Sequence, residues 1–163
     1  PSPLDRHYFN ATSEALGGIL AETLDGQLAG LSDDLTQQVK QDLLQVAARF
    51  HRSMDVRETN LTDPNERATL TNRLCGMLGE ILAQEQHGLT GEAQQQHVNA
   101  LGGALEQSLA SPIFDEIRLS REAAVPLQDA LSAELTNQLE KLNAKAAFLD
   151  EDSKNDPLAE KSI

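Results

Sequence analysis

Apolar residues recur at intervals of three and four along most of this chain, with polar residues between them. The clearest run comprises Leu35, Val39, Leu43, Val46, Phe50 and Met54. Such intervals place side chains on one face of an α-helix, because the helix has about 3.6 residues per turn. The run therefore predicts an amphipathic helix that begins near Ser32 and packs one face against a core.

Further stripes of this kind predict four more helices. The stripes run over residues 4–28, 70–81, 98–109 and 131–149; the helix of the third of these opens at Thr90, and that of the last begins at about Ser120 or Pro126. Residues typical of helix ends flank them: Ser2 before Pro3 and Asp63 before Pro64 are starts, and Gly88 is a stop. Five helices with defined ends are therefore expected.

The fold class follows from these helices and from the short connections between them. Nothing alternates with period two over a useful length, so no strand is expected. We predict an all-α, antiparallel up-and-down bundle of four to five long helices plus a short irregular helical segment. The irregular segment is residues 111–125, with a kink or restart at Pro126. A single helical-bundle domain is expected over 1–150, and a polar, flexible tail over 151–163.

Glycines lie inside several of the predicted helices. Gly17 and Gly18 occupy the same places in ALGGILAETL as Gly102 and Gly103 in ALGGALEQSL, and Gly76 lies in a weaker version of this segment. Glycine inside a helix costs about 1 kcal/mol relative to alanine. We expect close helix packing to offset this cost, with a neighbour's side chain against the glycines. A ligand groove is the alternative.

Composition and charge restrict the core and the partners. Aromatic residues make up 3% of the 163 residues, so Leu, Ile, Val and Ala must build the core. The formal net charge is −13. This charge works against binding to nucleic acids and to anionic membrane surfaces, because both need basic groups near phosphates. No run of 18 apolar residues is present, so no transmembrane segment is expected.

The residue types that carry chemistry do not form a recognisable site. Cys75 lies among apolar residues, and we expect a buried thiol. No pair of carboxylates lies within an apolar stripe, where burial would raise a pKa. The sequence predicts no catalytic residue, no metal and no cofactor, and it does not favour an enzyme. A two-histidine site across the turn at Gly88 is an alternative to solvated histidines at helix ends, which are His7, His51, His87 and His97.

A basic cluster on this acidic chain is the first candidate partner-binding surface. It consists of Arg49, Arg52 and Arg57, with His51 beside them and Arg67 and Arg73 on the next helix. The alternative is that these side chains form ion pairs with neighbouring Asp and Glu residues.

An apolar group in the irregular segment is the second candidate. Its members are Ile113, Phe114, Ile117 and Leu119. If these side chains are exposed, they form the hydrophobic centre of a partner site. The alternative is that they close the open end of the bundle.

These observations favour a non-enzymatic protein–protein interaction domain, with another protein as its partner. The alternatives are a self-associating structural protein, joined through the stripe over residues 131–149, and a helical small-ligand binder or enzyme. The Gln- and Leu-rich composition and the missing initial Met suit a domain excised from a larger bacterial secreted protein, such as a virulence effector. We expect a soluble protein that is cytoplasmic, or secreted without disulfides, or delivered into a host cell.

Overall fold

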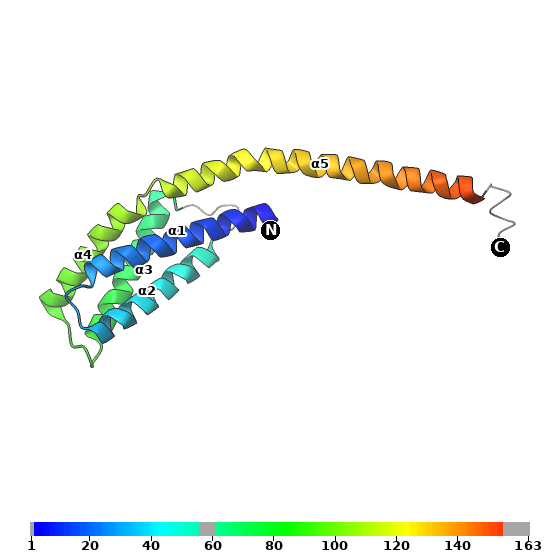
Figure 1. Ribbon diagram of the computed structural model, residues 1–163. Helices are drawn as coiled ribbons and strands as arrows, with labels where there is room; N and C mark the ends of the chain where they lie inside the picture. Colours follow the sequence, from blue (N-terminus) through cyan, green and yellow to red (C-terminus); the bar gives the residue numbers. More distant parts are fainter. Residues whose placement is uncertain (1, 56–60, 155–163) are drawn as a thin grey trace. The chain divides into compact units, whose positions relative to one another are not determined.

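Helices account for nearly all of the computed structural model, which describes residues 2–55 and 61–154 (Figure 1). No strand occurs in these ranges. The helices are α1 (Pro3–Gln27), α2 (Asp33–Ser53), α3 (Pro64–Ala83), α4 (Gly91–Leu109) and α5 (Ile113–Lys154). The all-α fold class is therefore confirmed.

Side-chain caps fix the starts of the first three helices. The Ser2 hydroxyl accepts a hydrogen bond from the Asp5 backbone N–H at 3.1 Å, and Asp63 accepts one from the Asn65 N–H at 2.9 Å. Ser32 caps α2 in the same way. Each cap satisfies one of the backbone N–H groups that lack a partner in a helix's first turn. The starts that the sequence predicts at residues 2, 32 and 63 are confirmed.

The chain divides into two units, Pro1–Arg121 and Glu122–Ile163. In the first unit, α1 packs against α2 and α4, and α3 packs against α2 and α4. The four helices thus form a closed ring of neighbours, as in an up-and-down bundle (Figure 1). Leucines dominate the core inside this ring, and the most deeply buried include Leu20, Leu43, Leu74, Leu82, Leu101 and Leu105.

The segment after α4 is regular where the sequence analysis expects irregularity. A helix begins at Ile113 and continues without a break through Pro126. Phe114 is 4% exposed and belongs to the core of the first unit, and Ile113 packs against that core. Phe114 is buried and Ile113 and Ile117 are half-buried, so that packing on one face supports this helix although the sequence shows no continuous stripe.

An ion pair joins the two ends of the first unit. The Arg121 guanidinium donates two hydrogen bonds to one carboxylate oxygen of Asp5, at 2.6 and 3.0 Å. Asp5 is buried, and the hydrogen bond from Arg121 lowers the pKa of its carboxyl group. The first turn of α1 is therefore anchored to the last residue of this unit.

Most of the helix glycines do not serve close packing. Added Cβ atoms at Gly17, Gly18, Gly76 and Gly103 would meet no atom within 4 Å. The expectation of a neighbour's side chain against these glycines is therefore wrong. It holds at Gly102, where the Cys75 Sγ atom would lie 3.4 Å from an added Cβ.

The described part of the second unit is the rest of α5, from Glu122 to Lys154. Every side chain from Asp129 to Glu151 is exposed. The polar tail expected over 151–163 is helical up to Lys154, and the remainder lies outside the described residues.

Candidate functional site

Six exposed leucines lie along one face of the second unit's helix. Their exposed fractions range from 55% at Leu149 to 73% at Leu127. We call this set the leucine face, and its members are Leu127, Leu131, Leu135, Leu139, Leu142 and Leu149.

Helix geometry keeps the leucine face in a single stripe. Each residue turns the helix by about 100°, so an interval of four moves a side chain about 40° forward and an interval of three about 60° back. The intervals along the face are four, four, four and three, and Ala146 continues it between Leu142 and Leu149. The stripe is about 33 Å long, from a rise of about 1.5 Å per residue.

The opposite side of this helix carries polar, charged and small residues, and also Phe148, which is 68% exposed. Asp129, Glu140 and Glu151 lie about half a turn from the leucines. A helix with this division normally buries its apolar face against another element. Single exposed leucines are common on protein surfaces, but a continuous apolar stripe marks an interaction surface.

The structure separates the apolar residues that the sequence analysis groups in segment 111–125. Phe114 is buried, Ile113 and Ile117 are half-buried, and Leu119 is 54% exposed. Ile113 and Phe114 therefore close the end of the bundle, which is the alternative stated for them above. These four residues do not form one exposed hydrophobic centre.

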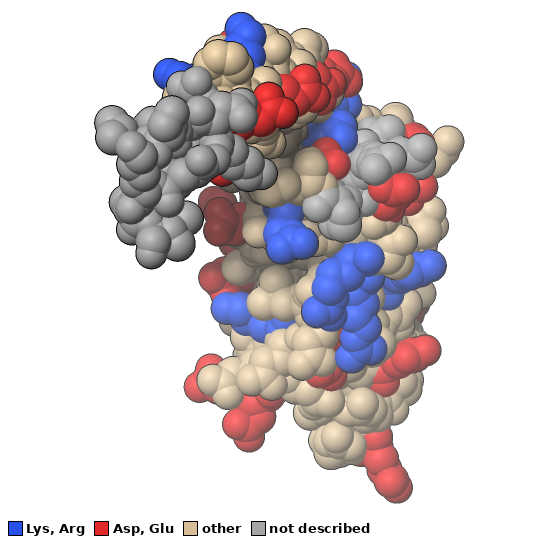
Figure 2. Space-filling view, turned by 90° about the vertical axis from the view of Figure 1, so that its right-hand side faces the viewer, with Lys and Arg blue, Asp and Glu red and all other residues tan. Residues whose placement is uncertain are grey.

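The basic cluster has a free surface in the first unit. Arg49, Arg52 and Arg73 are exposed, and no ion pair holds any of them within the described residues. The Arg73 guanidinium instead lies 5.2 Å from the centre of the Phe50 ring. Figure 2 shows basic side chains gathered on one face of the molecule. Arg57 lies outside the described residues.

Arg67 does not contribute to this free surface. Its guanidinium donates hydrogen bonds to the backbone carbonyl oxygens of Leu61 and Thr62, at 3.2 and 2.9 Å. It thereby holds the residues before α3 against the helix. Its role is therefore structural, and the cluster is smaller than the sequence suggests.

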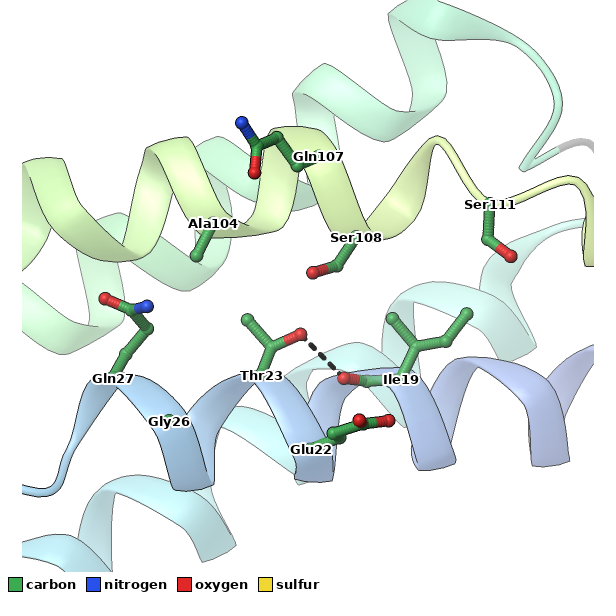
Figure 3. Close-up of a pocket in the computed structure, with 9 residues that line it drawn as sticks. All are labelled: Ile19, Glu22, Thr23, Gly26, Gln27, Ala104, Gln107, Ser108 and Ser111. Atoms are coloured by element: carbon green, nitrogen blue, oxygen red, sulfur yellow. Dashed lines mark hydrogen bonds between the residues drawn. The ribbon is translucent and has the colours of Figure 1, made fainter.

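A groove runs between α1 and α4 (Figure 3). Thr23 and Gln27 of α1 face Ala104 and Ser108 of α4 across it, and the Thr23 hydroxyl donates to the Ile19 carbonyl oxygen at 2.7 Å. None of the lining residues is buried. Ligand sites usually enclose most of the ligand and orient it with fixed polar groups, and this groove does neither.

A second groove lies between α3 and α4 and includes Gly102 and Gly103. Its walls carry Thr71, which is half-buried, and Asn72 and Glu106, which are exposed. The glycine-lined ligand groove considered above corresponds to this place. Like the first groove, it presents no buried polar group to a ligand.

Within the described residues, no group of three or more His, Cys, Asp or Glu side chains is placed to hold a metal ion. His87 is hydrogen-bonded to the Gln38 side chain at 3.0 Å. His51 contradicts the expectation of solvated histidines, because it is 1% exposed and its ring stacks on that of Phe9, with centroids 4.1 Å apart. Burial lowers the pKa of His51 and raises the pKa of the Cys75 thiol. Cys75 is half-buried, beside the Val98 carbonyl oxygen.

No helix in the described ranges is both long enough and apolar enough to cross a membrane. No protein family model, characterised protein or solved structure matches this chain.

The sequence contains the signal for the leucine face, but periodicity alone does not distinguish it from a core stripe. The stripe over 131–149 has the same spacing as those of the buried helices. The contacts among α1–α4, which form a closed ring in the first unit, are visible only in the structure.

Proposed function

We propose that this chain is a protein–protein interaction protein and that its contact surface is the leucine face of α5. The supporting observation is the exposure of six leucines along one side of a helix, whose other side carries polar and small residues and a single large apolar one, Phe148. Hydrophobic surface grouped in this way, with a polar surround, is the usual anatomy of a protein contact.

The size of the face is sufficient for binding. Burying one leucine side chain completely is worth about 1.5–3 kcal/mol. Six partly exposed leucines together therefore offset the lower part of the roughly 4–15 kcal/mol that association costs. A contact of moderate affinity is expected from this surface alone.

The shape of the face favours an amphipathic helix as partner. A straight stripe about 33 Å long matches the apolar side of another helix of similar length. Two such helices pack at about 20° with their axes about 8–10 Å apart, and the leucines of each fill the spaces between those of the other. A small ligand would cover only a part of the stripe.

Photo-crosslinking from the leucine face tests the proposal. A benzophenone is attached to a thiol introduced by Leu139→Cys, in a background with Cys75→Ser. Ala144→Cys, about 140° away around the helix, is the matched control. We expect crosslinks to an amphipathic helix of an acceptor protein from position 139 and few from position 144.

Two outcomes would contradict the proposal. Equal yields from positions 139 and 144 would show that the face has no preferred partner. Crosslinks from position 139 only to residues 2–121 of the same molecule would show that the chain covers its own leucines.

The cellular setting stays a prediction from composition. The sequence favours a soluble protein, either cytoplasmic or secreted without disulfides, and its Gln- and Leu-rich composition suits a bacterial secreted protein. Identifying the acceptor in the crosslinking experiment also tests this prediction, because the two proteins must meet in the same compartment.

A further inference from the structure

The C-terminal half of the leucine face has the spacing of a coiled coil. Leu135, Leu139, Leu142, Ala146 and Leu149 follow one another at intervals of four, three, four and three. This is the alternation of d and a positions in a heptad repeat, with Leu139 and Ala146 at a. All five side chains are exposed.

Polar residues flank this seam on both sides. The g positions are Gln138 and Lys145, and the e positions are Thr136, Asn143 and Asp150. Assemblies of more than two helices bury a wider apolar surface than a and d alone provide. The narrow seam therefore has room for one partner helix.

A second copy of the same seam matches it when the two helices are parallel and in register. Identical positions then face each other, so that leucine meets leucine in the layers of residues 135, 139, 142 and 149. In an antiparallel pair, a faces d, and no register brings leucine opposite leucine in more than two layers. The other leucines face residues such as Ser132 or Ala146.

The flanking charges favour the same orientation. In a parallel coiled coil, the g residue of one helix lies beside the e residue five positions later in its partner. Lys145 at g and Asp150 at e have this spacing, so that a parallel dimer forms the pair twice. Antiparallel pairing brings g positions together and e positions together, which offers no such pair.

We propose that the occupant of the leucine face is a second copy of this chain, joined through a parallel, in-register, two-stranded coiled coil over residues 135–149. This inference rests on the proposed function, because it specifies the partner of the same face. The seam spans only about two heptads, and short helices are marginal alone. Association in the micromolar range, coupled to formation of the helix, is expected.

Sedimentation of the full chain tests the self-association. We expect a monomer–dimer equilibrium between 1 and 200 µM. Leu139→Gln with Leu142→Gln removes one a and one d leucine while keeping good helix formers, and a weakening of at least roughly tenfold is expected. Phe148→Gln is the matched control, because Phe148 is 68% exposed but lies outside the seam. It should leave the dimer unchanged.

Disulfide trapping tests the orientation. Ser132 occupies the a position before Leu139, so that Ser132→Cys in the Cys75→Ser background places two thiols opposite each other only in the parallel dimer. We expect a dimer on a non-reducing gel after mild oxidation. Ala144→Cys, on the outer side of the helix, should give little.

The possible failures are distinguishable. If the protein is a monomer at 200 µM and position 139 crosslinks to a different protein, the proposed self-association is wrong, but the leucine face remains the contact surface. A monomer with crosslinks only to its own residues 2–121 overturns both. A dimer that is trapped from position 144, or is unaffected by the double leucine substitution, uses another surface and also overturns this inference.

Discussion

His51 is buried in the last turns of α2 although neither of its ring nitrogens has a hydrogen-bond partner. The ring packs on Phe9 as an apolar aromatic group would. A buried polar atom without a partner costs about 1–3 kcal/mol. The unpaired nitrogens of His51 therefore offset part of the stability that the packing of its ring provides.

Replacement of His51 by phenylalanine should therefore stabilise the protein. His51→Phe keeps an aromatic ring against Phe9 and removes both unpaired nitrogens. We expect the free energy of unfolding to rise by about 1 kcal/mol at pH 7.5, since strain from the larger ring offsets part of the gain. Denaturation by urea measures this change.

The pH dependence provides the second readout for the same variant. Because burial lowers the pKa of His51 from 6.5, the unfolded chain binds the extra proton first as the pH falls. Stability from the neutral ring is complete above about pH 6.5 and declines below it. The variant should lose this part of the decline. Between pH 7.5 and 5, the free energy of unfolding should fall more in the wild type than in the variant. An equal or smaller fall in the wild type would contradict the burial of a neutral His51.

At the scale of the elements, α5 contains a proline that the helix accommodates. Pro126 has no N–H to donate to the carbonyl oxygen of residue 122, and its ring crowds that carbonyl. The helix continues through this position all the same. Proline inside a helix costs about 3 kcal/mol relative to alanine, so that the turn around it is weaker than it would be with alanine at this position.

Pro126→Ala should strengthen this turn. We expect slower amide hydrogen exchange over residues 122–130 and a higher helix signal in circular dichroism. Residues 135–149 should change less, because the interruption affects about one turn. Leu119→Ala, on the same helix but without a backbone effect, is the control. If amide exchange over residues 122–130 is no slower in Pro126→Ala than in the control, the proline does not weaken this turn.

At the scale of the first unit, the Asp5–Arg121 pair joins residues that are far apart in sequence. Asp5 is 10% and Arg121 is 23% exposed at the side chain, so that solvent screens the pair in part. Two hydrogen bonds to one oxygen still provide a defined geometry. The pair holds the first turn of α1 in place against the start of α5.

Acid should weaken this connection in a defined range. The pKa of Asp5 is lowered from 3.8, and the stability that the pair contributes is therefore present above about pH 3.8 and lost as the pH falls below it. Arg121→Gln should cost about 1 kcal/mol at pH 7 and less at pH 2.5. Arg118→Gln, whose partner Asp115 is on the same helix, is the control. Equal losses from both substitutions at pH 7 would show that the Asp5 pair has no special role.

The sequence by itself determined the fold class, the five apolar stripes and the starts of the first helices. These are local properties, because the helix period and the capping of free N–H groups involve residues within a few positions of one another. The spacing of the leucines in α5 and the grouping of Arg49, Arg52 and Arg73 were also visible in the sequence.

Only the tertiary structure decided which apolar residues are covered. A stripe shows that a helix needs an apolar neighbour, but it does not say which helix provides one. Phe114 belongs to the core of the first unit, whereas the leucines of α5 from Leu127 onward are exposed. The burial of His51 and the Asp5–Arg121 pair arise in the same way, from residues that meet only when the helices pack.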